Sequence, residues 1–402
     1  MKVKKWHIYI IAIVCFALCF VAINKKYDPF YRVNGINNDN RALIEQYLDE
    51  EQQQYLIDNS IAVDLFIQYI DVPGFLLQNY EYYNMLNKAK VFSDRESLIE
   101  NANTMISRLE VSFGSDSLKQ CETLVSNNLV PAYLNQETFD FQNIDYYQII
   151  RTLYDTGEYQ YIEDTNGYVF KLQNDGIVTS EDKKAMLKEL SNSYDQKSLQ
   201  LLLTTPLQEG TTMVTNPQEL SVVVDQNHFI GSYEPKNIIS VTKISRFDGS
   251  MYLDRDAYTS LKEMYDAVIE ACGSGISLRK SYRSYERLSV QENASVLEKP
   301  GYSEYQLGTT IAFQHLDYSI EDFKETAAYQ WLLDNAHTYG YILRYPEGKQ
   351  EITGKEYQCN VFRYVGVDLA TLLHQNNWTL EEYNQQLAQQ NQQNQPDDET
   401  EQ

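Results

Sequence analysis

Hydrophobic and polar residues follow different patterns in successive parts of the chain. The run Ile8–Ile23 is almost wholly apolar. From Asp39 to about Thr205 apolar residues recur at helical spacing, whereas from Leu220 onward helical stretches alternate with short apolar runs typical of strands. Beyond Gln386 the chain is rich in Gln, Asn and Asp and cannot bury apolar area. The pattern predicts an apolar helix, a mostly helical region, a mixed domain and a disordered tail.

These changes of pattern set the predicted boundaries. Residues 206–218 carry prolines and clustered Thr and Gly, which favour a linker. The predicted parts are a cytoplasmic stub (1–5), a transmembrane anchor (6–24), a mostly helical extracytoplasmic region (39–205), the linker (206–218), a mixed domain (219–386) and a disordered tail (387–402).

The apolar run has the features of a membrane anchor. Trp6 and Tyr9 suit the membrane interface, and the run is long enough to cross the hydrocarbon layer of a bilayer. A secretory signal peptide has the same layout, but no small-x-small cleavage site is evident at Phe20–Asn24. We therefore predict an uncleaved, single-pass anchor. More lysines precede the run than follow it, which predicts a cytoplasmic amino terminus with the bulk of the chain outside the membrane.

Two segments of the helical region occur twice in similar form. Leu-Ile-Asp-Asn-Ser-Ile at Leu56 resembles Leu-Val-Ser-Asn-Asn-Leu at Leu124, and Asn-Tyr-Glu-Tyr-Tyr-Asn-Met-Leu at Asn79 resembles Asn-Ile-Asp-Tyr-Tyr-Gln-Ile-Ile at Asn143. The order indicates a duplicated helical unit. Coincidence in a Tyr- and Asn-rich chain is the alternative.

Two local signals follow the second copy. Asn166-Gly167 lies between Tyr, Ile and Val, Phe residues, which predicts a β-hairpin. Ser180 and the two acids after it supply a cap oxygen and first-turn charges, which predict a helix through Leu190.

Charge narrows the range of partners. The chain has 57 acidic and 33 basic side chains and a net charge of −24. Such a surface repels phosphate backbones, so we expect no nucleic-acid partner. Cys15 and Cys19 lie in the apolar run, and the remaining cysteines show no metal or redox spacing.

Two segments of the predicted mixed domain carry candidate chemistry. Residues 300–312 read Pro-Gly-Tyr-Ser-Glu-Tyr-Gln-Leu-Gly-Thr-Thr-Ile-Ala, and residues 357–366 read Tyr-Gln-Cys-Asn-Val-Phe-Arg-Tyr-Val-Gly. They resemble the metal-binding segments of the VanY-type D-alanyl-D-alanine carboxypeptidases (peptidase M15B-like), Gly-x-Ser-Glu-His-Gln-x-Gly-x-Ala-x-Asp and Glu-Pro-Trp-His-Tyr-Arg-Tyr-Val-Gly. Ser281-Tyr-Arg-Ser-Tyr-Glu and residues 329–346 resemble further family motifs. The resemblance spans about Leu220 to Tyr383 and implies an α+β carboxypeptidase-like domain.

The resemblance also implies that the metal site is degenerate. The three zinc-ligand positions fall on Tyr305, Ala312 and Val361, and the general-base position falls on Gln358. A catalytic zinc needs three protein ligands with donor atoms, and neither Ala nor Val has one. An amide cannot take up a proton as a general base does. We therefore predict no metal and no catalytic residue, so the domain resembles a pseudoenzyme. His315 and Asp317 are the candidates for displaced ligands.

Three polar residues remain as candidates for substrate binding. By resemblance, Arg283 would face a peptide and hold its carboxylate or carbonyl, with Ser284 and Ser303 nearby. An internal ion pair is the alternative role of Arg283. Leu288 replaces a family Gln and Ser281 replaces a Gly, which weakens the match. Structural roles are expected for His337, Arg344 and Arg363.

These inferences lead to a hypothesis with two rivals. The favoured one is a membrane-anchored, extracytoplasmic, catalytically inactive carboxypeptidase-like protein, which binds peptidoglycan stem peptides or another cell-envelope protein without a cofactor. The first rival is an active zinc D-Ala-D-Ala carboxypeptidase that trims those peptides. The second is a purely structural envelope scaffold.

Overall fold

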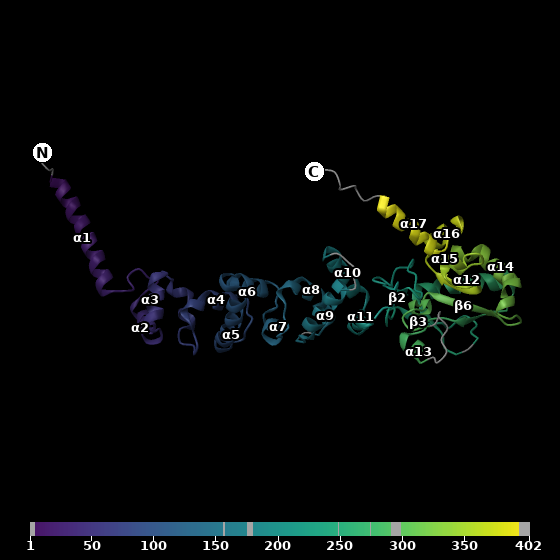
Figure 1. Cartoon of the computed structure of the whole chain (residues 1–402), viewed down its shortest axis with the longest axis horizontal. Helices are drawn as coiled ribbons and strands as arrows, with labels where there is room; N and C mark the ends of the chain where they lie inside the picture. The colour runs from purple at the N-terminus through teal and green to yellow at the C-terminus, as the bar shows by residue number, and fades with distance from the viewer. Residues whose placement is uncertain are drawn as a thin grey trace. The chain divides into compact units, whose positions relative to one another are not determined.

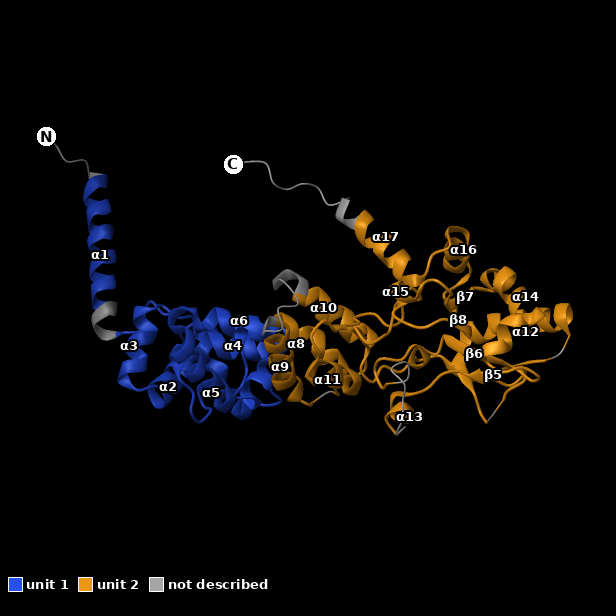
Figure 2. Cartoon of the chain, turned by 45° about the vertical axis from the view of Figure 1, so that its right-hand side comes forward, with its two compact units in different colours: residues 1–144 blue, residues 145–402 orange. Residues whose placement is uncertain are grey.

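The computed structural model describes residues 5–155, 157–174, 180–247, 249–273, 275–290 and 299–393. The chain divides into two compact units, residues 1–144 and 145–402 (Figure 2). Figure 1 labels the elements along the chain. The predicted mixture of helices and strands is confirmed, because unit 1 is helical and unit 2 contains both helices and sheets.

The amino-terminal helix α1 spans Lys5–Tyr27. Its segment Trp6–Ile23 is long and apolar enough to cross a membrane, with a mean hydropathy of 2.5, and none of this segment is buried against the rest of the chain. A signal sequence has the same properties. The helix is therefore a membrane anchor or a signal sequence by length and composition.

Unit 1 is built from short helices packed around buried Leu, Ile and Tyr side chains. Asn37, Asp49 and Asp94 cap three of these helices by accepting hydrogen bonds from first-turn backbone N–H groups. The α-helices after α1 are α2 (Asn38–Tyr47), α3 (Glu50–Asp58), α4 (Tyr80–Lys88), α5 (Arg95–Phe113), α6 (Ser117–Ser126) and α7 (Val130–Asn135).

The repeated segments adopt matching local structures. After α3, Ser60 is left-handed and Ile61 N–H donates to the Leu56 carbonyl; after α6, Asn128 is left-handed and Leu129 N–H donates to the Leu124 carbonyl. The other pair also matches, because a 3₁₀ turn leads into α4 and another leads into α8 (Ile144–Ile150). Equal local structure supports the predicted duplication.

The helical part of unit 2 corrects one local prediction. The predicted hairpin around Asn166-Gly167 is wrong, since these residues lie inside α9 (Gln160–Asn174). Buried Ile162, Thr165, Val169 and Leu172 recur at helical spacing, so burial of this stripe decides the conformation over the turn signal. The predicted helix from Ser180 is confirmed as α10 (Ser180–Ser193), and α11 (Gln196–Thr204) follows.

The stretch predicted as a linker contains a short strand, β1 (Thr212–Met213), which pairs in parallel with β2 (His228–Phe229). The elements that follow are β3 (Ile238–Ser240), β4 (Tyr252–Asp254), α12 (Arg255–Cys272), β5 (Ile276–Lys280), α13 (Tyr285–Ser289), η8 (Glu304–Leu307), β6 (Thr310–His315), α14 (Ala327–Asn335), η10 (Ala336–Tyr339), β7 (Tyr341–Tyr345), α15 (Gln350–Thr353), β8 (Gln358–Tyr364), α16 (Val367–Asn376) and α17 (Leu380–Gln393).

A four-stranded antiparallel sheet in the order β5-β6-β8-β7 is the centre of the mixed domain. One face carries Phe313 and Phe362, which pack in one hydrophobic core with Leu261 and Val268 of α12 and Leu332 of α14. The other face carries Ala312 and Val361. Successive residues of a strand point to opposite faces, so this core fixes which side chains can form a site on the other face.

A smaller core joins the last two helices to the domain. It contains Val365 at the end of the sheet, Ala370 and Leu373 of α16, and Leu380 of α17. Helix α17 continues to Gln393, later than the start of the tail at residue 387 that the sequence predicts. Its run of Glu, Gln and Leu favours helix. The remainder of the predicted tail lies outside the described residues.

Candidate functional site

The segment η8 and the strand after it bring the first degenerate motif onto the sheet. Gly308 ends η8 with φ of +75°, a left-handed conformation that suits glycine. A Cβ atom here would lie 2.5 Å from Ile238 Cδ1, so a larger residue would also have to displace the end of that side chain. The turn places Tyr305 before the sheet and Ala312 within β6.

Ala312 of the first motif and Val361 of the second motif meet on the sheet. Ala312 and Val361 are direct partners across β6 and β8, and both are buried. Tyr345 joins them where the pairing of β7 with β8 shifts register, and these three side chains form a small hydrophobic cluster. We call this cluster the apolar patch.

The residues at the family's metal-ligand positions do not fit zinc. The side chains of Ala312 and Val361 present only carbon atoms, and Tyr305 offers a phenol, which is not among the usual ligands of a catalytic zinc. Throughout the described ranges, no group of three His, Cys, Asp or Glu side chains is placed to hold a metal ion. Tyr305, Ala312 and Val361 therefore do not supply the nitrogen, sulfur or carboxylate donors that a catalytic zinc uses.

The candidates for displaced ligands lie elsewhere. His315 is three positions after Ala312 on the same strand, which turns it to the opposite face with Phe313. Its Nδ1 accepts a hydrogen bond of 3.1 Å from the Asp317 backbone N–H, and its ring contacts Tyr318. His315 and Asp317 are thus not brought to the apolar patch.

Gln358 begins β8 and is partly buried. It pairs with Tyr345 beyond the register shift, and Val361 lies three positions further along the strand. By resemblance Gln358 stands at the family's general-base position, and an amide has no basic atom for that role.

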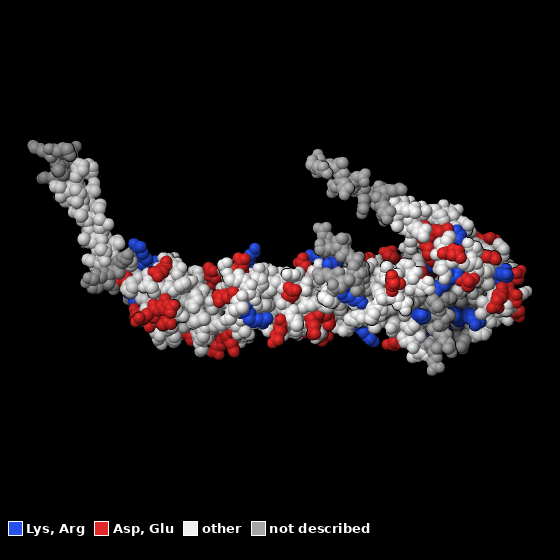
Figure 3. Space-filling view, in the orientation of Figure 1, with Lys and Arg blue, Asp and Glu red and all other residues white. Residues whose placement is uncertain are grey.

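A cationic cavity of about 460 Å³ lies beside the first motif. Its lining includes Arg279, Lys280, Arg283 and Arg287, although the chain as a whole carries a net charge of −24. Figure 3 shows basic side chains gathered in the part of unit 2 where Figure 1 draws β6, amid acidic side chains across the visible face. We call this cavity the cationic pocket. It is suited to an anionic ligand.

The three predicted binding residues have different surroundings. Arg283 lines the cationic pocket, and its backbone N–H donates to the Tyr305 carbonyl at 3.1 Å. Ser284 caps α13, because its hydroxyl accepts a hydrogen bond from the Arg287 backbone N–H at 3.2 Å. Ser303 is fully buried. The geometry thus places Arg283 where it can meet a ligand, gives Ser284 a local structural contact and puts Ser303 below the surface.

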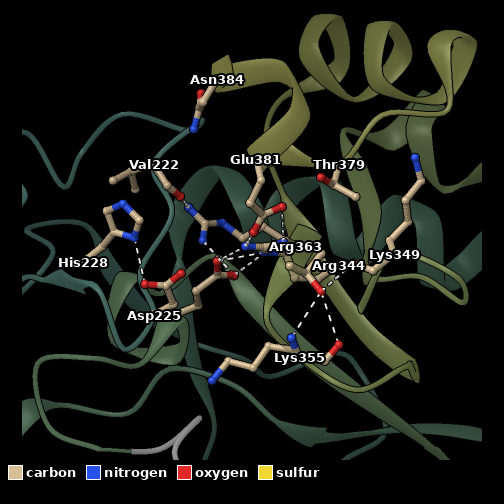
Figure 4. A network of polar contacts seen from close by, with 12 residues as sticks. Val222, Asp225, His228, Arg344, Lys349, Lys355, Arg363, Thr379, Glu381 and Asn384 are labelled. Atoms are coloured by element: carbon tan, nitrogen blue, oxygen red, sulfur yellow. Dashed lines mark hydrogen bonds and ion pairs between the residues drawn. The ribbon is translucent and has the colours of Figure 1, made fainter. Parts of the chain in front are cut away.

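Next to the apolar patch lies a buried ionic network (Figure 4). Glu304 accepts hydrogen bonds from Arg344 Nε at 2.8 and 3.0 Å, and its Oε2 is 3.1 Å from Arg363 Nη1. Arg344 Nη2 also donates to Glu381 Oε1 of α17 at 2.6 Å. Two carboxylates balance two guanidinium groups, so the network buries no net charge.

Burial and pairing act in opposite directions on these groups. Burial opposes ionisation of Glu304, but the charges of Arg344 and Arg363 more than offset it and lower the pKa of this carboxyl. Burial likewise disfavours the charged form of Arg344, but the Glu304 carboxylate outweighs it and raises the Arg344 pKa. The structural roles expected for Arg344 and Arg363 agree with this geometry.

Gln306 of the same motif has a structural role. It is fully buried, its Nε2 donates to the carbonyls of Gly231 and Tyr233 at 2.8 and 3.0 Å, and its Oε1 accepts from the Gly301 N–H at 3.0 Å. These bonds hold the first motif against the start of the mixed domain. His337 lies away from this motif and stacks on His374 of α16 at 3.8 Å, which agrees with a structural role.

Comparison with known proteins identifies the class. Residues 250–367 match the family model described as VanY: D-alanyl-D-alanine carboxypeptidase. The chain is 33% identical over 158 residues to the bifunctional D-Ala-D-Ala dipeptidase and D-Ala-D-Ala carboxypeptidase VanXYC of Enterococcus gallinarum, covering 34% of this chain and 83% of the relative. The inferred carboxypeptidase YodJ of Bacillus subtilis (strain 168) is 32% identical over 193 residues, covering 44% of this chain and 70% of YodJ.

A solved structure of the LdcB LD-carboxypeptidase, reported for its peptidoglycan recognition, matches 44% of this chain and 91% of its own at 29% identity and a TM-score of 0.40. On the sequence relatives, this chain belongs to the VanY D-alanyl-D-alanine carboxypeptidase family. The resemblance seen in the motifs is thereby confirmed.

Sequence reasoning missed the cationic pocket and the partner of Arg344. Arg279 and Lys280 end β5, and only the pairing of β5 with β6 brings them beside the first motif. Glu381 follows Arg344 by many residues and meets it through the fold of α17. The basic Arg279-Lys280 pair before Ser281 was the available signal.

Proposed function

We propose that the C-terminal domain is a catalytically inactive carboxypeptidase-like receptor that binds peptidoglycan stem peptides through the cationic pocket. The apolar patch carries this proposal, because it joins Ala312 and Val361, the residues that by resemblance replace two metal ligands. Without a bound metal, a water molecule keeps a pKa near 15.7 rather than about 7, so a hydroxide nucleophile is not available at neutral pH.

The proposed ligand follows from the family and from charge. Relatives named as D-Ala-D-Ala dipeptidase and carboxypeptidase act on peptides that end in D-Ala-D-Ala. Such peptides carry a terminal carboxylate, which Arg and Lys side chains bind by charge-assisted hydrogen bonds. Arg283 lines the pocket and is the residue that resemblance assigns to the peptide. The proposed role therefore keeps recognition and omits hydrolysis.

The proposal includes anchoring by α1 with the pocket outside the cell. The exposed apolar segment Trp6–Ile23 and the flanking lysines support it. Intact cells treated with an external protease should lose the mixed domain. Protection of that domain, or a mature protein in the medium that begins near Asn24, contradicts the proposed topology.

The full-length chain purified in detergent tests the function. Zinc content is measured by mass spectrometry, release of D-alanine from a synthetic D-Ala-D-Ala peptide by a coupled assay, and binding of that peptide by calorimetry. We expect peptide binding, no stoichiometric zinc and no D-alanine. One zinc per chain together with D-alanine release establishes the active-enzyme rival, and absence of peptide binding favours the scaffold rival.

A further inference from the structure

One basic side chain of the cationic pocket lies on the same face of the sheet as the apolar patch. Lys280 is the direct partner of Ala312 across β5 and β6. Directly opposed residues of an antiparallel pair have Cβ atoms about 4.5–5.5 Å apart. The Lys280 side chain therefore starts next to one of the positions at which the family has a metal ligand.

The ammonium group lies close to a second such position. Lys280 Nζ is 5.8 Å from the centroid of the Tyr305 ring, within the range of a cation–π contact. Lys280 is only partly exposed, and a charge in such a setting is screened less than one in open water. The positive charge of Lys280 thus lies beside Ala312 and Tyr305, two of the residues that by resemblance replace the metal ligands.

Arginine side chains extend this positive charge along the pocket. Arg279 precedes Lys280 and donates to the Gln314 side chain at 2.7 Å, while Arg283 and Arg287 lie on the segment that follows β5. The cavity of about 460 Å³ that they line can admit the end of a short peptide.

The chemistry of peptide hydrolysis tells which peptide suits such a charge. A catalytic metal polarises the carbonyl of the bond to be cut, and cleavage turns that carbonyl into the carboxylate of the shortened peptide. A metal ion can bind either the carbonyl oxygen of the uncut peptide or the carboxylate of the shortened peptide. An ammonium group binds a carboxylate more strongly than a neutral carbonyl, because opposite full charges attract each other.

We propose that Lys280 takes the electrostatic place of the metal and makes the pocket a receptor for stem peptides from which the terminal D-alanine has already been removed. This inference rests on the proposed peptide-binding function and gives it a substrate class. The chain would then bind the product of a carboxypeptidase reaction that another protein catalyses.

The test compares two probes on the full-length chain in detergent. Calorimetry measures the affinities of diacetyl-L-Lys-D-Ala and diacetyl-L-Lys-D-Ala-D-Ala. We expect the shorter peptide to bind about tenfold more tightly, since a hydrogen bond to a charged group contributes more than a neutral one. The comparison uses the unaltered chain and does not depend on a variant that folds. Equal affinities, or tighter binding of the longer peptide, overturn the inference.

Variants assign the preference to Lys280. In Lys280→Met we expect the preference for the shorter peptide to vanish. In the control Lys262→Met, which removes a lysine of α12 paired with Asp266 at 3.2 Å, the preference should persist. A preference that survives in a folded Lys280→Met variant also overturns the inference. Binding of both peptides without preference leaves the proposed function standing, whereas binding of neither contradicts the proposed function itself.

Discussion

Two regions on the same face of the sheet, the ionic network and the apolar patch, differ in what they keep of the family pattern. Thr310 and Arg363 form one paired row across β6 and β8, and Ala312 and Val361 form the row two residues along. In the first region Arg363 meets Glu304, a residue that the motif shares with the family. In the second, two metal-ligand positions carry small apolar side chains.

The difference shows that one short motif serves two separable purposes. Glu304 and Gln306 hold η8 in place through buried polar contacts, and neither contact involves the positions assigned to metal. Tyr305, between them in sequence, has a different contact, because its ring lies 5.8 Å from Lys280 Nζ. The buried polar contacts of the motif can therefore remain although Ala312 and Val361 offer no metal-binding atom.

Breaking the ionic network should produce the largest effect. Glu304→Gln removes the carboxylate between Arg344 and Arg363 and leaves buried positive charge uncompensated, which we expect to lower the free energy of unfolding by about 3–5 kcal/mol. Urea denaturation followed by circular dichroism measures this change. The control Glu351→Gln alters an exposed residue of α15 and should cost less than about 0.5 kcal/mol. Equal losses in the two variants contradict the assigned role of Glu304.

Converting the apolar patch back to a ligand set should give the next effect. The variant Tyr305→His, Ala312→Asp, Val361→His places three donors on the backbone positions that the family uses. Zinc that binds the native state at a hundred times its Kd adds about 2.7 kcal/mol, which calorimetry detects as a higher Tm. Hydrolysis should stay absent until Gln358→Glu supplies a proton acceptor. If the triple variant folds but zinc does not raise its Tm, these three backbone positions do not bring their side chains to one metal site.

We expect the smallest effect on stability from the pair His228 and Asp225, in which His228 Nδ1 lies 2.7 Å from Asp225 Oδ1. The hydrogen bond to Asp225 raises the pKa of His228, and burial opposes ionisation of Asp225 but the His228 contact offsets it and lowers the Asp225 pKa. The contribution of His228 to the free energy of unfolding is complete below the ordinary pKa near 6.5 and is lost as the pH rises through the raised pKa. The contribution of Asp225 is lost in acid, as the pH falls through its lowered pKa.

We therefore expect His228→Asn to lower Tm more at pH 5.5 than at pH 8.5. Thermal scans of the two proteins at both pH values measure the difference. A larger loss at the higher pH contradicts the assigned pair.

The sequence was informative where a residue's role follows from its type in a local motif. The order of the motifs predicts that Tyr305, Ala312 and Val361 stand at metal-ligand positions, and the family resemblance on which this prediction depends is confirmed. The hairpin failed at Asn166-Gly167, because a local turn signal carries no information about the buried helical stripe around it. Lys280 required the register of β5 with β6, which depends on contacts between distant parts of the chain.

The buried Glu304 network has a consequence for how the domain depends on metal. Where a structural metal holds a domain together, the free energy of metal binding is part of the free energy of folding, so a chelator unfolds it. Here ion pairs and the sheet hold the corresponding backbone. The domain should therefore mature and persist where zinc is scarce or sequestered, under conditions in which a zinc-dependent relative would lose its activity.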